Sequence, residues 1–104
     1  MKTWKSEEIG TGVWRLFLSE DAYDRDVEDA VLYFENVKGE WQYNFSTYIM
    51  GRSYNHCPLK VETLEDAKKE VEEWLIKAYK NEIESLQNSI SFYREKLKFL
   101  DKVG

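Results

Sequence analysis

The clearest pattern in the chain is an alternation of apolar and polar residues within residues 30–50. Such alternation is typical of a β-strand that buries one face, because successive side chains point to opposite sides. A tight turn at 38–39 would pair this strand with the one before it and place Leu32 opposite Phe45. The alternating residues are Trp41, Tyr43, Phe45 and Ile49 on one face and Gln42, Asn44, Ser46 and Tyr48 on the other.

Shorter segments on either side of this region extend the predicted sheet. Residues 3–9 and 13–18 flank a Gly-Thr-Gly sequence at 10–12, and the second segment is rich in bulky residues that suit a half-buried strand. We therefore expect a β-hairpin here. Residues 52–62 can add a fourth strand, but Pro58 has no N–H to donate and confines that strand to an edge or a break. The first part of the chain thus predicts an antiparallel sheet of three to four strands.

A long helical segment follows the sheet. Thr63 is followed by Leu64 and two acids, which is the pattern of an N-cap and of a first turn near the positive end of a helix dipole. From Leu64 to Lys102 the chain contains no glycine or proline. The segment is therefore either one long helix or two helices that form a hairpin, with a break near Lys80 and Asn81.

The apolar positions of this helical segment change phase along its length. A first stripe is assigned to the sheet, and a second follows steps of three and four residues that are typical of a heptad seam. A seam of this kind needs a partner helix, so we expect residues 83–100 to mediate self-association. The first stripe comprises Leu64, Ala67, Val71, Trp74 and Ala78. The second begins with Ile76 and Tyr79 and continues with the predicted oligomerisation residues Ile83, Leu86, Ile90, Tyr93, Leu97 and Leu100.

These elements fit one small domain of the α+β class. A chain of 104 residues has room for a single hydrophobic core, so 1–104 is expected to form one domain, with the sheet in 1–62 and the helical segment in 63–102. Hydrophobic residues make up 42% of the chain and aromatic residues 15%, which is too rich for a disordered protein. Because so small a core leaves no room for a large enclosed cavity, ligand sites are expected on the surface or between copies.

The negative charge of the chain is concentrated in one segment. The net charge is −5, and residues 19–29 alone hold six acids against one arginine. The rest of the chain is balanced and leaves no basic stripe for a phosphate backbone, so direct nucleic-acid binding is not expected. Because like charges repel and isolated surface charges add little stability, we expect the acids to contact a basic protein partner, with a disordered solvated loop as the alternative. The predicted partner-binding residues are Glu20, Asp21, Asp24, Asp26, Glu28 and Asp29.

Targeting and redox features indicate a cytoplasmic protein. The first eight residues lack the apolar region of a signal peptide, and no later stretch approaches the apolar run that crosses a bilayer. The single cysteine cannot form an intramolecular disulfide, which agrees with a reducing compartment. With one cysteine and one histidine, the chain cannot build a zinc site alone.

No sequence pattern indicates catalysis, a cofactor or a metal site, and we expect none of them. His56 and Cys57 are neighbours, but adjacent residues on a strand point to opposite faces, so the imidazole cannot activate that thiol. Glycine-rich phosphate loops and the common hydrolase motifs are absent from the sequence. Four acids match ligand positions of a calcium-binding loop, but Asp29 stands where such a loop requires glycine. Those four acids are Asp24, Asp26, Glu28 and Glu35.

The chain has 16 aromatic residues, and eleven of them precede the helical segment. A single helix stripe cannot cover both faces of a sheet, so some aromatic surface is expected to stay uncovered. Exposed aromatic rings beside an arginine can stack a purine base or anchor a protein. A nucleotide-binding protein is therefore an alternative, with Arg15, Arg52, Tyr33, Tyr48 and Tyr54 as its candidate residues.

The order of these elements resembles that of small proteins carried by phages and mobile elements. The shared features are a short sheet, the sequence Thr-Leu-Glu-Asp-Ala-Lys-Lys-Glu-Val-Glu-Glu-Trp-Leu at 63–75, and a heptad tail. Some of those proteins block host defence, as anti-CRISPR proteins do, so the resemblance implies a non-enzymatic inhibitor that occupies a nucleic-acid-binding surface or captures a nucleotide signal. From the residues themselves we expect an inhibitor or regulator that binds a basic protein. A nucleotide-binding sponge and a dimeric structural or scaffold module are the alternatives.

Overall fold

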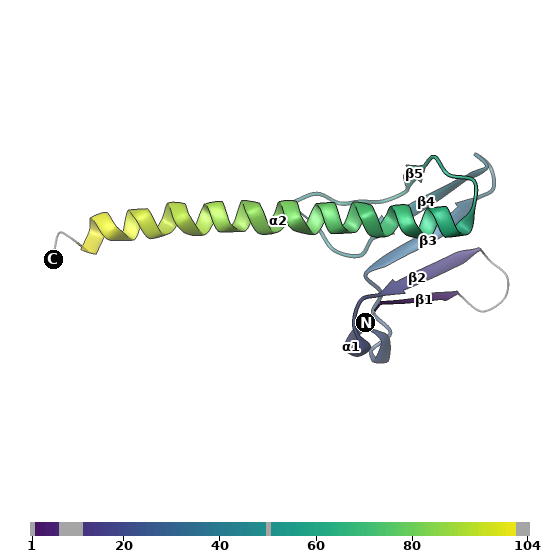
Figure 1. The fold of residues 1–104 in the computed structure, drawn as a ribbon, viewed down its shortest axis with the longest axis horizontal. Coiled ribbons are helices and arrows are strands. Elements are labelled where there is room, and N and C mark those ends of the chain that lie inside the picture. Colours follow the sequence, from purple (N-terminus) through teal and green to yellow (C-terminus); the bar gives the residue numbers. More distant parts are fainter. Residues whose placement is uncertain (1, 7–11, 50, 102–104) are drawn as a thin grey trace.

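The computed structural model describes residues 2–6, 12–49 and 51–101, which form an antiparallel sheet followed by one long helix (Figure 1). The elements are β1 (Thr3–Ser6), β2 (Val13–Phe17), α1 (Glu20–Asp24), β3 (Ala30–Glu35), β4 (Glu40–Phe45), β5 (Cys57–Leu59) and α2 (Leu64–Asp101). The five strands lie in chain order, so each strand pairs with the one before it. The predicted α+β class is confirmed, with five described strands in place of three or four.

Both ends of the sheet follow the predicted strand signals. β1 and β2 form the expected antiparallel hairpin, with Trp4 opposite Leu16, although part of its turn, 7–11, lies outside the described residues. At the other end, β5 is three residues long and pairs only with β4 in the sheet, so that Pro58 lies opposite Gln42. An edge strand tolerates proline because it needs hydrogen bonds on one side only.

β3 and β4 pair in a register that differs by two residues from the predicted one. Leu32 lies opposite Tyr43 rather than Phe45. The predicted two-residue turn at 38–39 is wrong, because the chain turns over the four residues 36–39. A shift of two residues keeps every side chain on its predicted face of the strand, so the buried face of β4 is the expected one.

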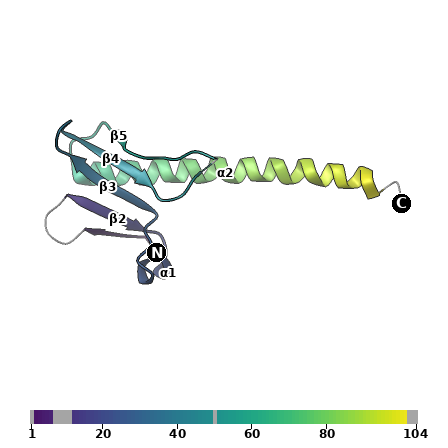
Figure 2. The same cartoon turned by 180° about the vertical axis from the view of Figure 1, so that it is seen from behind.

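The hydrophobic core lies between one face of the sheet and the first half of α2. Figure 2 shows the sheet lying across this half of the helix. The helix contributes Ala67, Val71 and Leu75, each at most 3% exposed. On the strands, the buried side chains of this core occupy alternate positions, so they all belong to one face. The residues from the sheet side are Leu16, Ala30, Leu32, Tyr43, Phe45, Ile49 and Leu59.

α2 begins where the sequence predicts and continues without a break. The backbone N–H of Asp66 donates to Thr63 Oγ1 over 3.2 Å, which confirms Thr63 as the N-cap. One helix runs to Asp101, so the alternative of a helical hairpin with a break near 80–81 is wrong. At 1.5 Å per residue its 38 residues span about 57 Å, which is longer than the sheet is wide.

The predicted sheet-facing stripe of α2 needs one correction. Ala67 and Val71 are fully buried as expected, but Trp74 is 44% exposed and Leu75 takes the buried position. The buried residues of α2 are spaced by four, so the one after Val71 is Leu75. Consecutive helix residues point about 100° apart, and Trp74 therefore lies on the flank of this buried stripe. There the indole Nε1–H of Trp74 donates to Glu70 Oε1 over 3.4 Å.

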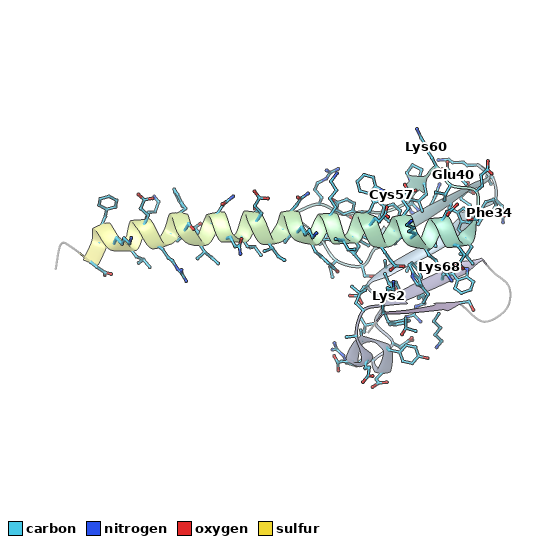
Figure 3. The ribbon with its side chains drawn as sticks, in the orientation of Figure 1. Lys2, Phe34, Glu40, Cys57, Lys60 and Lys68 are labelled. Atoms are coloured by element: carbon cyan, nitrogen blue, oxygen red, sulfur yellow. The ribbon has the colours of Figure 1, made fainter. Side chains whose placement is uncertain are left out.

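Two lysines help to fix the N-terminal hairpin against α2. The ammonium group of Lys2 pairs with the carboxylate of Glu72, which also accepts the indole N–H of Trp4 over 3.0 Å. Lys68 lies over the Trp14 ring, with its Nζ 4.1 Å from the ring centroid. Figure 3 shows Lys2 and Lys68 in this region, where the first half of α2 passes the β1–β2 hairpin. The orientation of the helix on the sheet is therefore fixed by polar contacts as well as by the core.

The second half of α2 extends beyond the sheet (Figures 1 and 2). The molecule measures 66 × 30 × 18 Å, and its radius of gyration is 18.6 Å, whereas a compact domain of this length has a radius of about 13 Å. The projecting helix accounts for the difference. Its side chains stand away from the rest of the chain (Figure 3).

Candidate functional site

An exposed apolar ridge runs along the projecting half of α2. It consists of the six predicted oligomerisation residues, and each of these side chains is 49–69% exposed. Within the described residues, none of the six belongs to the hydrophobic core. We call this set the distal ridge: Ile83, Leu86, Ile90, Tyr93, Leu97 and Leu100.

Two more exposed phenylalanines lie on the projecting half of α2, outside the distal ridge and nearer the side that carries Asn88, and the sequence analysis missed both. Phe92 and Phe99 are 55% and 66% exposed. The Phe92 ring contacts the neighbouring Tyr93, with 5.6 Å between centroids, and Lys96 Nζ lies 4.7 Å from the Phe92 centroid. Neither phenylalanine occupies an a or d position of the heptad seam. Their spacing of seven residues was the sequence signal that could have revealed them. An exposed apolar surface of this extent is typical of a protein interface.

The acidic segment at 20–29 is ordered and packs on the second face of the sheet. Its first part forms α1, which is capped by Ser19 because the backbone N–H of Ala22 donates to Ser19 Oγ over 3.1 Å. Tyr23 on α1 packs edge-on against Phe17, with 5.3 Å between ring centroids. This contact leaves Phe17 only 1% exposed. The segment therefore covers part of the sheet face that α2 leaves open.

Three acids of this segment have partners inside the fold. Arg15, half-buried on β2, donates to Asp26 Oδ1 over 2.7 Å and to Glu28 Oε2 over 2.8 Å. The carboxylate of Asp29 accepts the backbone N–H of Leu18 over 2.9 Å. The sequence analysis found no folding reason for concentrating these acids, and the structure supplies one. Their side chains hold the connection between β2 and β3.

The contact with Arg15 alters the ionisation of Glu28. Burial acts to raise the pKa of this carboxyl, but the hydrogen bond and charge of Arg15, together with a backbone hydrogen bond, leave the pKa below its usual value. A pKa that is depressed in the folded state stabilises the protein above the pKa of the unfolded chain, about 4.3 for glutamate. That stabilisation is lost as the pH falls through the folded-state pKa.

We expect Glu28→Gln to lower the free energy of unfolding by about 1 kcal/mol at pH 7. The difference from the wild type should shrink as the pH falls below the pKa of the unfolded chain, about 4.3, and through the lower pKa of the folded state, because the wild-type carboxylate then becomes neutral as well. Urea unfolding at pH 7 and pH 3 measures both quantities. Glu20→Gln, at an exposed position, is the control and should change little. A Glu28→Gln penalty that stays constant over this range contradicts a stabilising role for the charge.

The other three acids face solvent on α1. Asp21 pairs with Arg25 over 2.8 Å, but both side chains are more than 60% exposed, so the pair contributes little stability. Glu20 and Asp24 are also exposed. α1 lies at the β1–β2 edge of the sheet, off to one side of the axis of α2 (Figure 1). The carboxylates of α1 are therefore open to a partner without competition from the distal ridge.

The five candidate nucleotide-binding residues do not form one site. Arg15 is engaged by acids, as described above. Tyr33 lies on the open face of the sheet, where its hydroxyl bonds to Gln42 Oε1 over 3.0 Å and to the ring of His56. Tyr48 follows the end of β4 and is 77% exposed. Tyr48, which the alternating pattern placed on the polar face of the strand, thus lies beyond the end of β4 at Phe45.

Arg52 and Tyr54 do lie together, beside a pocket of about 280 Å³ at the edge of α2. The Arg52 guanidinium carbon is 5.5 Å from the Tyr54 centroid. The Tyr54 ring in turn packs on Phe45, with 5.0 Å between centroids. Aromatic rings with cations at the rim suit a flat anionic ligand. The pocket is lined by Tyr43, Phe45, Arg52, Tyr54, Trp74, Lys77, Ala78 and Asn81.

A polar network covers the open face of the sheet over β3 and β4. Gln42, 4% exposed, donates to Glu40 Oε1 over 2.9 Å and accepts from Tyr33. The backbone N–H of His56 donates to the side chain of Asn44. The His56 ring lies on this face, whereas Cys57 contributes to the core side, so the two point apart as predicted. The polar half of the alternating strand pattern was the sequence signal for this network.

Within the described residues, no group of three or more histidine, cysteine, aspartate or glutamate side chains is placed to hold a metal ion. No described helix combines the length and the apolar character required to span a bilayer. Comparisons with protein-family models, curated proteins and solved structures found no match. What the chain does must therefore be inferred from its own surfaces.

Proposed function

We propose that this protein is a non-enzymatic binding protein that self-associates through the distal ridge and offers its sheet domains to a protein partner. The observation that carries the proposal is the exposure of all six ridge residues, at 49–69%, on a helix that extends from the fold. Most of the stability of a helix in a protein comes from packing its apolar face rather than from the propensity of its residues. Burying a leucine or isoleucine side chain contributes about 1.5–3 kcal/mol. A second helix on the ridge would therefore stabilise both.

Light scattering over a range of protein concentrations tests self-association. We expect particles of more than one chain at tens of micromolar, which corresponds to an association free energy of about −6 kcal/mol. Particles with the mass of one chain at that concentration contradict the proposal.

For the partner, we propose a protein with a basic surface whose activity this chain inhibits or regulates. Support comes from the exposed carboxylates of α1 at one corner of the sheet domain. They belong to Glu20, Asp21 and Asp24. Opposite charge on a partner steers encounter and raises the association rate. Affinity capture from the native host, followed by identification of the captured protein, supplies the partner for the test.

Replacing Glu20 with Gln and Asp24 with Asn should slow association with that partner and make it less sensitive to salt. Steering depends on opposing charge and is screened within about 8 Å at physiological salt. The matched control is Glu95→Gln with Asp101→Asn, which removes the same charge from exposed positions on the projecting helix. Surface plasmon resonance at several salt concentrations gives both rates. An unchanged on-rate and salt dependence in the α1 variant contradicts an electrostatic role for α1.

A nucleotide-binding sponge is the second candidate, favoured by the pocket beside Arg52 and Tyr54. A ligand with a Kd of about 0.1 mM, added at about 1 mM, stabilises the folded state by about 1.4 kcal/mol. We therefore expect a raised Tm in thermal-shift assays with the bound nucleotide, and no shift for Arg52→Ala. Arg25→Ala serves as the control, because Arg25 is exposed directly after α1, as its C-cap. Flat melting temperatures with cyclic and linear nucleotides remove this candidate.

A further inference from the structure

We propose that two copies pair through the distal ridge with their α2 helices antiparallel, so that the two sheet domains lie at opposite ends of the pair. This inference rests on the proposed self-association and adds the orientation and register of the helices. It is carried by the direction in which the ridge points, by the position of the sheet and by the charges beside the ridge.

The distal ridge points to the same side of α2 that the sheet covers further upstream. Tyr93 follows Leu75 by 18 residues, and Leu97 follows Tyr79 by 18 residues, which corresponds to five turns of 3.6 residues. Leu75 is buried in the core, and Tyr79 packs against it. A second helix that lies on the ridge therefore approaches from the side on which the sheet lies.

The sheet excludes a parallel partner that matches the ridge along its whole length. In a parallel pair, the first half of the partner helix would continue past Ile83 towards Leu75, along the side that the sheet already covers. The partner's sheet would meet the same obstruction, because both sheets would lie at one end. In an antiparallel pair, each sheet lies beyond the partner's Leu100. The ridges can then meet without moving either sheet.

An antiparallel pair also matches the ridge residues with one another. In a heptad the ridge residues alternate between two positions, called a and d. With a two-fold axis between Ile90 and Tyr93, each a residue of one helix meets a d residue of the other. Such a two-fold contact uses the same patch on both copies, so it closes as a dimer and leaves no unpaired ridge. The matched layers are Ile83 with the partner's Leu100, Leu86 with the partner's Leu97, and Ile90 with the partner's Tyr93.

The charges beside the distal ridge favour the same orientation. The start of the ridge carries a small net negative charge and its end a small net positive charge. Antiparallel pairing brings the acidic start of one helix towards the basic end of the other, whereas parallel pairing brings like charges together. Each exposed charge pair contributes little by itself. The sum of these charge interactions is attractive in the antiparallel pair and repulsive in the parallel pair, so it favours the antiparallel one where the apolar contacts are similar. The start, 80–84, carries Lys80, Glu82 and Glu84 for a net charge of −1, and the end, 94–101, carries Arg94, Glu95, Lys96, Lys98 and Asp101 for a net charge of +1.

Thiol cross-linking of the full chain tests the orientation. In a Cys57→Ser background, one variant carries Leu86→Cys and a second, distinguished by a tag of different length, carries Leu97→Cys. The two are refolded separately and together, and each sample is treated with a short bismaleimide. The antiparallel pair predicts a product only in the mixture, linking residue 86 of one chain to residue 97 of the other. Circular dichroism checks that both variants keep their helix.

The outcomes separate this inference from the proposed function. Products from either variant alone show a parallel pair, which overturns the inference but keeps self-association. Absence of any product from chains that are dimeric by light scattering also overturns it, because the copies then meet elsewhere. If the wild type is monomeric, self-association itself fails. Capture of a foreign helix on the ridge of a monomeric chain would identify another occupant and would also overturn the inference.

A second measurement avoids any change to the ridge. A spin label is placed on the exposed position of Lys77 by Lys77→Cys in the Cys57→Ser background. In the antiparallel pair, the two labels are separated by 29 residues along the axis, or about 44 Å at 1.5 Å per residue. In a parallel pair they face each other at about 10–20 Å. A short label–label distance in pulsed electron paramagnetic resonance contradicts the antiparallel arrangement.

Discussion

Replacing Leu86 and Ile90 with lysine is expected to leave the protein folded but monomeric. Both side chains lie in the middle of the distal ridge and are 53% and 49% exposed in the single chain, so the substitutions remove no core contact. In a pair, each substitution places an ammonium group in an apolar contact without a counter-charge, which costs several kcal/mol. Sedimentation velocity should therefore show single chains at a concentration at which the wild type is associated.

The matched control for this variant is Asn88→Lys with Ser91→Lys. These exposed positions add the same two charges on the side of α2 that faces away from the ridge. The control should associate like the wild type. If both variants dissociate equally, the effect reports added charge rather than loss of the apolar contact. If neither dissociates, the distal ridge is not the contact between copies.

Replacing Leu32 with alanine is expected to destabilise the fold by about 3 kcal/mol. Leu32 is 0% exposed and lies between Trp14 and Tyr43 on the neighbouring strands. Truncation removes its transfer free energy and leaves a cavity, because a core held between a sheet and a helix relaxes only in part. Since a domain of this size has only about 5–15 kcal/mol of stability in total, this is a large fraction of it.

Urea unfolding measures this loss, with Val37→Ala as the control. Val37 is 94% exposed in the turn between β3 and β4, so its truncation should change stability by less than about 0.5 kcal/mol. Both substitutions are best compared in the Leu86→Lys, Ile90→Lys background, because association adds a concentration-dependent term to apparent stability. Equal losses at Leu32 and Val37 would contradict the core described for the sheet and α2.

The strands and their buried faces were predictable because alternation is a local property of the sequence. The register was not, because it depends on the turn. The carboxylate of Glu35 accepts backbone N–H groups of Val37 over 3.0 Å and Lys38 over 2.7 Å. Gly39, with a φ of 66°, completes a four-residue turn. A side chain that caps a turn in this way leaves no periodic pattern in the sequence. The two-residue turn at 38–39 was therefore predicted from the glycine alone.

The start of the helix was predictable from the sequence, but its continuity was left open and one buried position was assigned wrongly. Thr63 and the first-turn acids marked the N-terminus, and the lack of glycine and proline allowed one helix. Trp74 was assigned to the sheet because it continues the first stripe three residues after Val71. The structure buries Leu75, four residues after Val71, since the position of the sheet decides which of the two possible steps is buried.

The acidic segment shows where charge counting fails. Its net charge was visible in the sequence, but its partner Arg15 lies on β2, and only the fold brings the two together. Likewise, Arg15 was a candidate ligand-binding residue because nothing in the sequence shows that its guanidinium contacts Asp26 and Glu28. Pairings between side chains on different elements depend on topology, which local patterns do not encode.

Hydrogen exchange along α2 tests most directly whether a second copy covers the distal ridge. Within one chain the sheet packs only on the first half of the helix, so the amides of 83–100 should exchange rapidly in a monomer. At tens of micromolar we predict protection in both halves, with protection of 83–100 lost on dilution and in the Leu86→Lys, Ile90→Lys variant. Rapid exchange of 83–100 in the wild type at that concentration, while the first half stays protected, would contradict self-association through the ridge.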